Sequence, residues 1–314
     1  MEMIRWLSGQ GRTICWGEAY FTRAFNYFYI SRVWGDVPLV TDYVADASSV
    51  APLPRTAQQT VLNQCVADLN IARQYLDWQD QTSTDRVVRA DKGAVFALLA
   101  HLYAWEGKYD SCSMACDSVM SAAAGYMLVD GKSLNTIYKG QSTEGIFEIA
   151  QDQQAESIIV GSSISGVTLA NPLVSITNQT QPPWGLNAGL LKKLYSDTND
   201  LRYSTLFDSL NTGSAIVVEC TKYSNVLNIN SNSAYQVAVN NIIVFRLADI
   251  ELLKAEALAA KTAPDYGGAL TWVNAIRTRA GITTPLTGIT GHALLDTITA
   301  ERGQGAIPGR PSFL

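Results

Sequence analysis

The chain has 314 residues, of which 47% are apolar and 16% are charged, so it is long enough to bury a large hydrophobic core. Its formal net charge is -5 and Lys and Arg do not cluster, so the chain provides no positive field to attract a phosphate backbone. Nucleic acid is therefore not expected as a partner. The five cysteines are an odd number at irregular spacing, which predicts buried thiols and no disulfide framework.

Apolar runs along the chain are short. None at the start has the length of a signal peptide, and none elsewhere approaches the roughly 20 residues that span a bilayer. Taken by itself, the sequence is therefore expected to lack an export signal and a membrane span.

The first 125 residues carry the spacing of amphipathic helices. A first helix is predicted over 18–34, where large apolar residues such as Phe21 and Phe28 recur on one face. The Gly-Asp-Val-Pro run at 35–38 ends it, because Pro38 has no amide hydrogen to donate. Trp34, at the end of the bulky face, is expected in the core.

Three more helices are predicted before residue 125. The second spans 56–76 with Thr56 as its cap, and the third spans 90–105 with Gly and Ala on one side, where a neighbouring helix can approach closely. A short turn leads into the fourth, 110–123. The last two helices are expected to form an αα-hairpin.

Residues 130–245 differ in kind, because they are rich in Ser, Thr, Asn, Gln and Gly. Short alternating runs at 145–149 and 215–218 predict brief strands, and a helix is expected only at 190–195. Such a long polar insertion on a helical scaffold is where a binding surface is expected.

The segment 249–279 repeats the pattern of the earlier hairpin. Stacking of such pairs is typical of tetratricopeptide-like helical repeats. The sequence therefore predicts a mainly α fold of tetratricopeptide-like hairpins with a loop-rich, short-strand insertion. We expect one domain over 1–314, with a helical scaffold at 18–125, the insertion at 130–245 and the second hairpin at 246–281.

No metal or cofactor site is predicted. The histidines His101 and His292 are isolated, and Cys112 and Cys116 lie four residues apart on a helix without further ligands nearby. Nucleophile elbows, phosphate-binding glycine loops and dinucleotide fingerprints are absent from the sequence. We therefore expect no catalytic residues, and a protein that is not an enzyme.

Acidic residues crowd one stretch of the insertion. Glu144, Glu148, Asp152 and Glu156 are interpreted as a solvated acidic face, with a carboxylate pair for glycoside hydrolysis as the alternative.

Charged residues also interrupt the apolar helices near the C-terminus, and these are expected to form buried structural pairs, with a place at a ligand or partner interface as the alternative. They are Arg246, Asp249, Glu256, Arg277 and Arg279.

Trp184 is the candidate ligand-binding residue. It lies in the loop sequence Gln-Pro-Pro-Trp-Gly at 181–185, where its large indole is not part of a predicted helix face. Its flat apolar ring suits the C–H face of a sugar, with packing within the loop as the alternative.

Together these landmarks resemble the SusD/RagB family of nutrient-binding proteins. The run Glu18-Ala19-Tyr20-Phe21-Thr22-Arg23-Ala24 with Trp34-Gly35-Asp36-Val37-Pro38-Leu39-Val40 is similar to the family's first signature, and further matches follow in the family's order. Those matches are Asp68-Leu69, Arg89-Ala90, Asn199-Asp200-Leu201-Arg202, Phe245-Arg246-Leu247-Ala248-Asp249-Ile250, Lys254-Ala255-Glu256-Ala257 and Val273-Asn274-Ala275-Ile276-Arg277-Thr278-Arg279-Ala280-Gly281.

The resemblance implies non-catalytic binding of a glycan or oligosaccharide at the bacterial outer-membrane surface. It implies a SusC-like TonB-dependent transporter as partner, and no cofactor. No ligand-binding residue transfers by motif, because ligand contacts in the family come from variable loops. Two other readings stay open: a tetratricopeptide-like scaffold that binds proteins without a small ligand, and a helical glycosidase.

Both ends of the chain depart from the family pattern. Relatives begin with a secretion signal, a lipidated Cys and a further helical segment ahead of the first signature. At the other end, 298–302 fits the pattern and 303–314 does not. Codons for that tail can be chosen so that a one-nucleotide shift restores a family-like reading, so we interpret 303–314 as a frameshifted tail.

Overall fold

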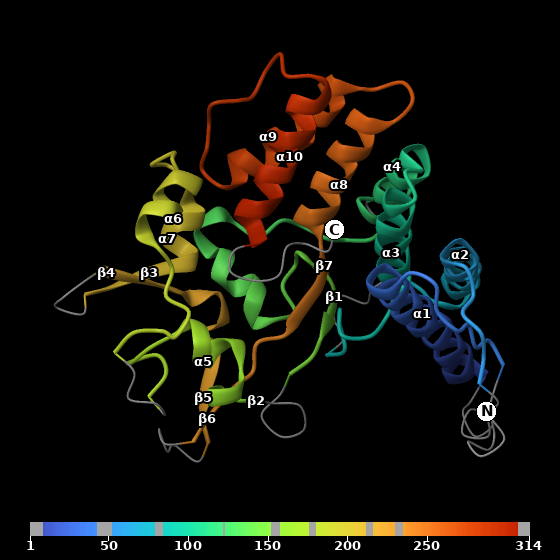
Figure 1. Cartoon of the computed structure of the whole chain (residues 1–314), viewed down its shortest axis with the longest axis horizontal. Coiled ribbons are helices and arrows are strands. Elements are labelled where there is room, and N and C mark those ends of the chain that lie inside the picture. The colour runs from blue at the N-terminus through green and yellow to red at the C-terminus, as the bar shows by residue number, and fades with distance from the viewer. Residues whose placement is uncertain are drawn as a thin grey trace. The chain divides into compact units, whose positions relative to one another are not determined.

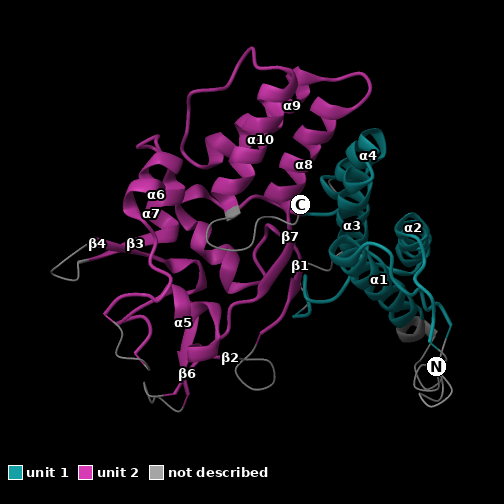
Figure 2. Cartoon of the chain, viewed as in Figure 1, with its two compact units in different colours: residues 1–125 teal, residues 126–314 magenta. Residues whose placement is uncertain are grey.

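The computed structural model describes residues 9–42, 52–78, 84–121, 123–151, 158–175, 180–211, 216–229 and 235–306. The chain divides into two compact units, residues 1–125 and 126–314 (Figure 2). The helical segment expected at 18–125 lies in the first unit. The loop-rich segment and the second hairpin lie in the second.

Unit 1 is helical in its described residues, as predicted, although the helix bounds differ. Its first helix extends further toward the N-terminus than the periodicity indicated, and its last ends earlier. The third begins after Asp91, whose carboxylate accepts a hydrogen bond from the Ala94 amide at 2.7 Å. The helices are α1 (Gly9–Trp34), α2 (Gln58–Tyr75), α3 (Lys92–Trp105) and α4 (Tyr109–Val119) (Figure 1).

Helices α1 and α2 pack as an antiparallel pair. Near the start of α1, Gly17 lies so close to the end of α2 that a Cβ atom there would be 2.6 Å from Leu76 Cγ. At the opposite end of the pair, the Gln58 side chain donates to the Ser31 carbonyl oxygen at 2.8 Å. Phe21 and Phe28 of α1 are fully buried in the core of this unit.

The predicted cap at Thr56 is wrong. Thr56 instead forms an isolated antiparallel bridge with Val37 through two backbone hydrogen bonds of 2.9 and 3.2 Å. The first amide of α2, that of Gln58, is satisfied by Asp36 Oδ1 at 2.9 Å. The cap comes from a residue 22 positions earlier, because the antiparallel pairing returns the chain to that point.

The α3–α4 hairpin is confirmed, and both of its helices bury small residues. Ala94, Ala97 and Ala100 of α3 are fully buried, as are Cys112 and Cys116 of α4. The five cysteines form no disulfide, and all but Cys15 are buried, in agreement with the prediction of buried thiols.

In unit 2, α8 (Leu247–Ala260) and α9 (Tyr266–Arg279) form the predicted second hairpin, and α10 (Gly291–Ala306) packs on both (Figure 1). Apolar side chains from all three helices share one core. Helix α10 continues past Arg302 to Ala306. Residues 307–314 of the tail lie outside the described residues, and the frameshift stays a prediction.

Short antiparallel sheets occupy the rest of unit 2, and two of their strands match the predicted runs at 145–149 and 215–218. The first sheet pairs β1 (Gly145–Ile149) with β7 (Ile242–Arg246), and another pairs β3 (Phe207–Asn211) with β4 (Ile216–Cys220). The remaining sheet has the order β2 (Ile158–Ile159), β6 (Gln236–Ala238) and β5 (Val226–Asn228).

More helices interrupt the insertion than the one predicted. They were missed because segments this short show too little periodicity, and side-chain caps such as Ser163 and Asp200 stabilise them locally. The described helices here are η3 (Gly131–Lys139), η4 (Val160–Ser162), α5 (Ile164–Thr168), α6 (Ala188–Leu194), α7 (Leu201–Leu206) and η5 (Thr221–Tyr223). The prediction of a mainly helical chain is confirmed.

Candidate functional site

Trp184 lies on the loop between α5 and α6, and 60% of its surface is exposed to solvent. The backbone around it is held in place, because the Trp184 amide donates to the Val167 carbonyl oxygen at 2.8 Å. Two residues further on, the Leu186 amide donates to the Val218 carbonyl oxygen at 3.1 Å. The structure thus presents an exposed indole on a backbone fixed on both sides.

The Trp184 loop rests against the sheet formed by β3 and β4. A Cβ atom on Gly185 would lie 3.1 Å from Val217 Cγ1, so this part of the loop packs on β4. The elements next to the loop expose further apolar side chains, Leu190 of α6 and Ile216 of β4. An exposed indole ring is suited to stacking on a ligand with one apolar face.

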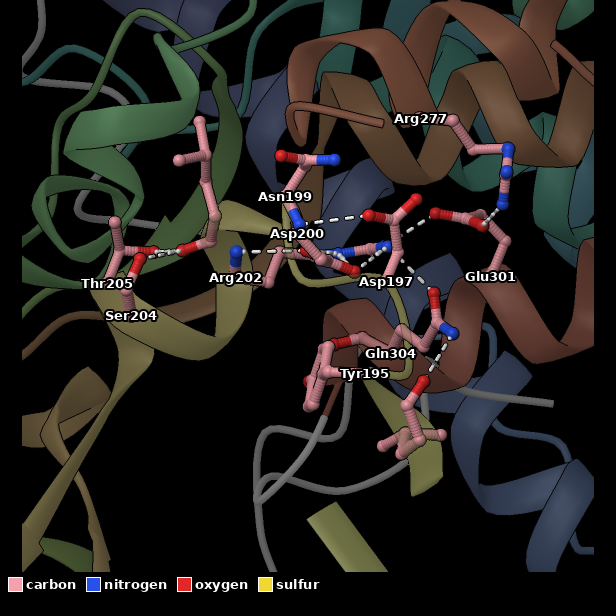
Figure 3. A network of polar contacts seen from close by, with 12 residues as sticks. Tyr195, Asp197, Asn199, Asp200, Arg202, Ser204, Thr205, Arg277, Glu301 and Gln304 are labelled. Carbon is pink, nitrogen blue, oxygen red and sulfur yellow. Dashed lines mark hydrogen bonds and ion pairs between the residues drawn. The ribbon is translucent and has the colours of Figure 1, made fainter. Parts of the chain in front are cut away.

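A buried polar network attaches α6 and α7 to α10 (Figure 3). Arg202 of α7 contacts Asp200 with a nitrogen–oxygen distance of 2.7 Å, Glu301 at 2.5 Å and the Gln304 side-chain oxygen at 2.7 Å. The Tyr195 hydroxyl at the end of α6 donates to the Gln304 carbonyl oxygen at 2.6 Å. These contacts fix the C-terminal end of α6, and α7, to α10.

Burial and the neighbouring charges together set the protonation states in this network. Burial alone lowers the pKa of Arg202, but the hydrogen bond to Asp200 and the charges of Glu301 and Asp200 outweigh it and raise that pKa. Burial also raises the pKa of Tyr195. Arg202 therefore stays charged and Tyr195 stays neutral, as hydrogen-bond donors to α10.

A second buried network surrounds Glu144, which the sequence analysis placed on a solvated acidic face. That interpretation is wrong, because Glu144 is fully buried between two guanidinium groups. Its two oxygens lie 2.8 Å from Arg246 Nη1 and 3.0 Å from Arg279 Nη1, and the Val129 amide donates to it at 3.2 Å. A carboxylate in an apolar region needs such counterions.

Glu148 does not lie on a solvated acidic face either, so that interpretation is wrong for it too. Its Oε2 accepts hydrogen bonds from the Gln141 amide and the Asn241 side chain, both at 2.8 Å, and the residue is fully buried. Because Glu144 and Glu148 are both buried and each contacts protein donors, neither is placed to protonate a glycosidic oxygen. Asp152 and Glu156 lie outside the described residues.

The other charged residues that were predicted to pair, Asp249, Glu256 and Arg277, do so. Arg302 lies 2.6 Å from Glu256 and 3.3 Å from Asp249, and Arg277 lies 3.6 Å from Glu301. These contacts join α8, α9 and α10, so the charges serve the scaffold.

Trp34 is not a core residue, which corrects the prediction. It is the last residue of α1, immediately before Gly35 with φ at +69°, and 62% of its surface is exposed. The helix periodicity places it on the bulky face, but α1 ends there and its ring lines an open hollow with Tyr27 and Pro38.

Among the described residues, His, Cys, Asp and Glu nowhere gather in groups of three or more that would hold a metal ion. Within the same residues, every helix is too short or too polar to span a bilayer.

Comparison with known families follows the division into units. The family model described as "SusD family" matches residues 126–304, and the model described as "Starch-binding associating with outer membrane" matches residues 10–104. The first match covers more than half of the chain, which therefore belongs to the SusD family. The second description, which names association with the outer membrane, agrees with the location at the outer-membrane surface expected from the sequence.

Individual relatives support the assignment. SusD-like protein P2 of Formosa agariphila is 25% identical over 289 residues, which are 84% of this chain and 55% of that protein. SusD-like protein P38 of the same organism is 26% identical over 83% of this chain and 56% of its own length. The chain thus spans a little over half the length of these relatives.

Solved structures share the fold. The SusD homolog from Bacteroides thetaiotaomicron superposes with a TM-score of 0.78 at 29% identity, over 95% of this chain and 65% of that one. A second SusD superfamily protein from that organism gives a TM-score of 0.70 at 26% identity, over 96% and 68%.

Proposed function

We propose that this protein binds a glycan or oligosaccharide at the outer-membrane surface and delivers it, without catalysis, to a SusC-like TonB-dependent transporter. The match of the SusD family model to residues 126–304 carries the proposal. The starch-binding description of the second family model supports the ligand class.

Within this proposal, Trp184 contributes a stacking platform for a sugar ring. An aromatic side chain buries about 150–250 Å² when fully covered, so covering one face removes roughly 60 Å² from water. At about 25 cal/mol per Å² this contributes about 1.5 kcal/mol, or about tenfold in affinity.

The test is calorimetric titration of the purified chain with a panel of oligosaccharides and polysaccharides. Trp184→Ala is expected to weaken binding about tenfold. The matched control is Ile159→Ala, which removes a similarly exposed aliphatic side chain from β2 of the same unit and is expected to bind like wild type. Wild-type affinity in Trp184→Ala would remove Trp184 from the proposal, and no binding to any glycan would overturn the ligand class.

Two further assays separate the two other interpretations. In an affinity capture from cell extract, retention of protein partners by a chain that binds no sugar would favour a tetratricopeptide-like interaction scaffold. Release of new reducing ends from a bound polysaccharide would establish a glycosidase, whereas the proposed binding protein leaves the polysaccharide intact.

Delivery to a transporter is tested in the source bacterium. A tagged copy, crosslinked in intact cells, is expected to retain a TonB-dependent transporter that mass spectrometry identifies. Deleting that transporter should abolish growth on the bound glycan, and undiminished growth would contradict the delivery step.

A further inference from the structure

A hollow of about 610 Å³ opens in unit 1 beside the C-terminal half of α1 and the segment that follows it. Its volume lies within the roughly 300–1,000 Å³ of small-ligand sites. We propose that this hollow is a second carbohydrate site, which takes one pyranose unit of a neutral glycan. Its ligand class rests on the proposed function, but its residues are independent of Trp184.

One wall of the hollow is apolar. The Trp34 indole is largely exposed, and Ile30, Pro38 and the buried Val37 also line the hollow. An exposed indole at the rim of a cavity offers the flat surface on which the C–H face of a pyranose stacks.

Besides Arg23 and Tyr27, the lining has three polar side chains with planar ends: Asn26, Asp36 and Arg55. Each is exposed, and amide, carboxylate and guanidinium groups can make paired hydrogen bonds to neighbouring hydroxyls. Asp36 uses Oδ1 to accept from the Gln58 amide at 2.9 Å.

The hollow is built on fixed groups. Arg23 makes two hydrogen bonds of 2.7 Å to the buried carboxylate of Asp68 and donates a third to the Thr41 carbonyl oxygen at 2.9 Å. The Tyr27 hydroxyl accepts from the Val40 amide at 2.7 Å. These contacts hold α1 and the following segment together, so ligand binding would cost little conformational entropy.

The charges of the lining favour a neutral ligand. Asp68 compensates Arg23, and the hydrogen bond between them raises the pKa of Arg23. The two remaining charges, Arg55 and Asp36, have opposite signs. A sulfated or uronic ring would therefore find no net positive charge here, whereas the hydroxyls of a neutral ring find both donors and acceptors.

The test titrates the purified chain and its variants with the neutral glycan that it binds best and with a sulfated glycan. Trp34→Ala is expected to weaken binding at one of two sites about tenfold, and Asn26→Ala to weaken the same site. Trp184→Ala weakens the other. Met114→Ala, which removes an exposed apolar side chain from α4, is the control and should bind like wild type.

Because Trp34 and Asn26 are exposed, both variants should keep the wild-type melting temperature. Unchanged stoichiometry and affinity in both would overturn this second site, and the Trp184→Ala result would still decide the proposed function. Tighter binding of the sulfated glycan at the Trp34 site would overturn the neutral ligand class.

Discussion

Glu301 of α10 offers the sharpest test of how the scaffold is held together. Its carboxylate contacts Arg202 at 2.5 Å and Arg277 at 3.6 Å, and Asp200 is the other acidic partner of Arg202 (Figure 3). Two guanidinium groups thus face two carboxylates. Glu301→Gln keeps the shape of the side chain but leaves one positive charge without compensation inside the protein.

The expected cost is set by burial. Arg202, Asp200 and Glu301 are all buried, where removing one partner of an ion pair costs about 3–5 kcal/mol. Glutamine keeps one acceptor oxygen, so we expect the lower end, about 3 kcal/mol. For a folding unit of this length, that lowers the melting temperature by roughly 6–12 °C.

Thermal and urea unfolding of the purified protein, followed by circular dichroism, measures the cost. Asp296→Asn is the matched control, because Asp296 lies exposed on the same helix and loses the same charge. It should stay within about 0.5 kcal/mol of wild type. If Glu301→Gln falls within about 1 kcal/mol of the control, the argument from buried charge fails.

Two further predictions concern unit 2. Burial raises the pKa of Glu251 to about 7, and the charge of Glu144 adds to this effect. The folded protein therefore binds this proton more tightly than the unfolded chain does. The contribution of Glu251 to the stability of the folded state is greatest at low pH, where Glu251 is protonated in both states, and it is lost as pH rises toward 7. Glu251→Gln should therefore match wild type at pH 4 and exceed it by up to about 3 kcal/mol at pH 8 in urea unfolding, and an equal difference at both pH values would contradict the shift. Gly131→Ala should cost more than about 2 kcal/mol in the same assay, because its Cβ would overlap the Arg279 carbonyl oxygen, whereas Gly267→Ala has room and should stay within about 1 kcal/mol; equal effects would refute the packing.

The sequence predicted features that depend on neighbours along the chain. Helical periodicity identified the α3–α4 and α8–α9 hairpins, and the Pro/Gly context placed Trp184 on a loop, where its ring is exposed. The irregular spacing of the cysteines predicted free thiols, and the structure contains them. Each of these signals lies within a window of a few helical turns, so periodicity and local backbone chemistry suffice.

Tertiary structure decided what depends on distant partners. Glu144 looked like a surface charge until the fold placed it against Arg279, 135 positions away, and Asp36 replaced Thr56 as the source of the cap for α2 because an antiparallel pair brings its ends together. The helix periodicity that placed Trp34 in the core contains no information on which part of α1 is covered by other elements, and the end of α1 that carries Trp34 is exposed. Local sequence therefore determined the helices of the two hairpins, whereas burial and charge compensation, which depend on the whole fold, decided which side chains hold the protein together and which stay exposed.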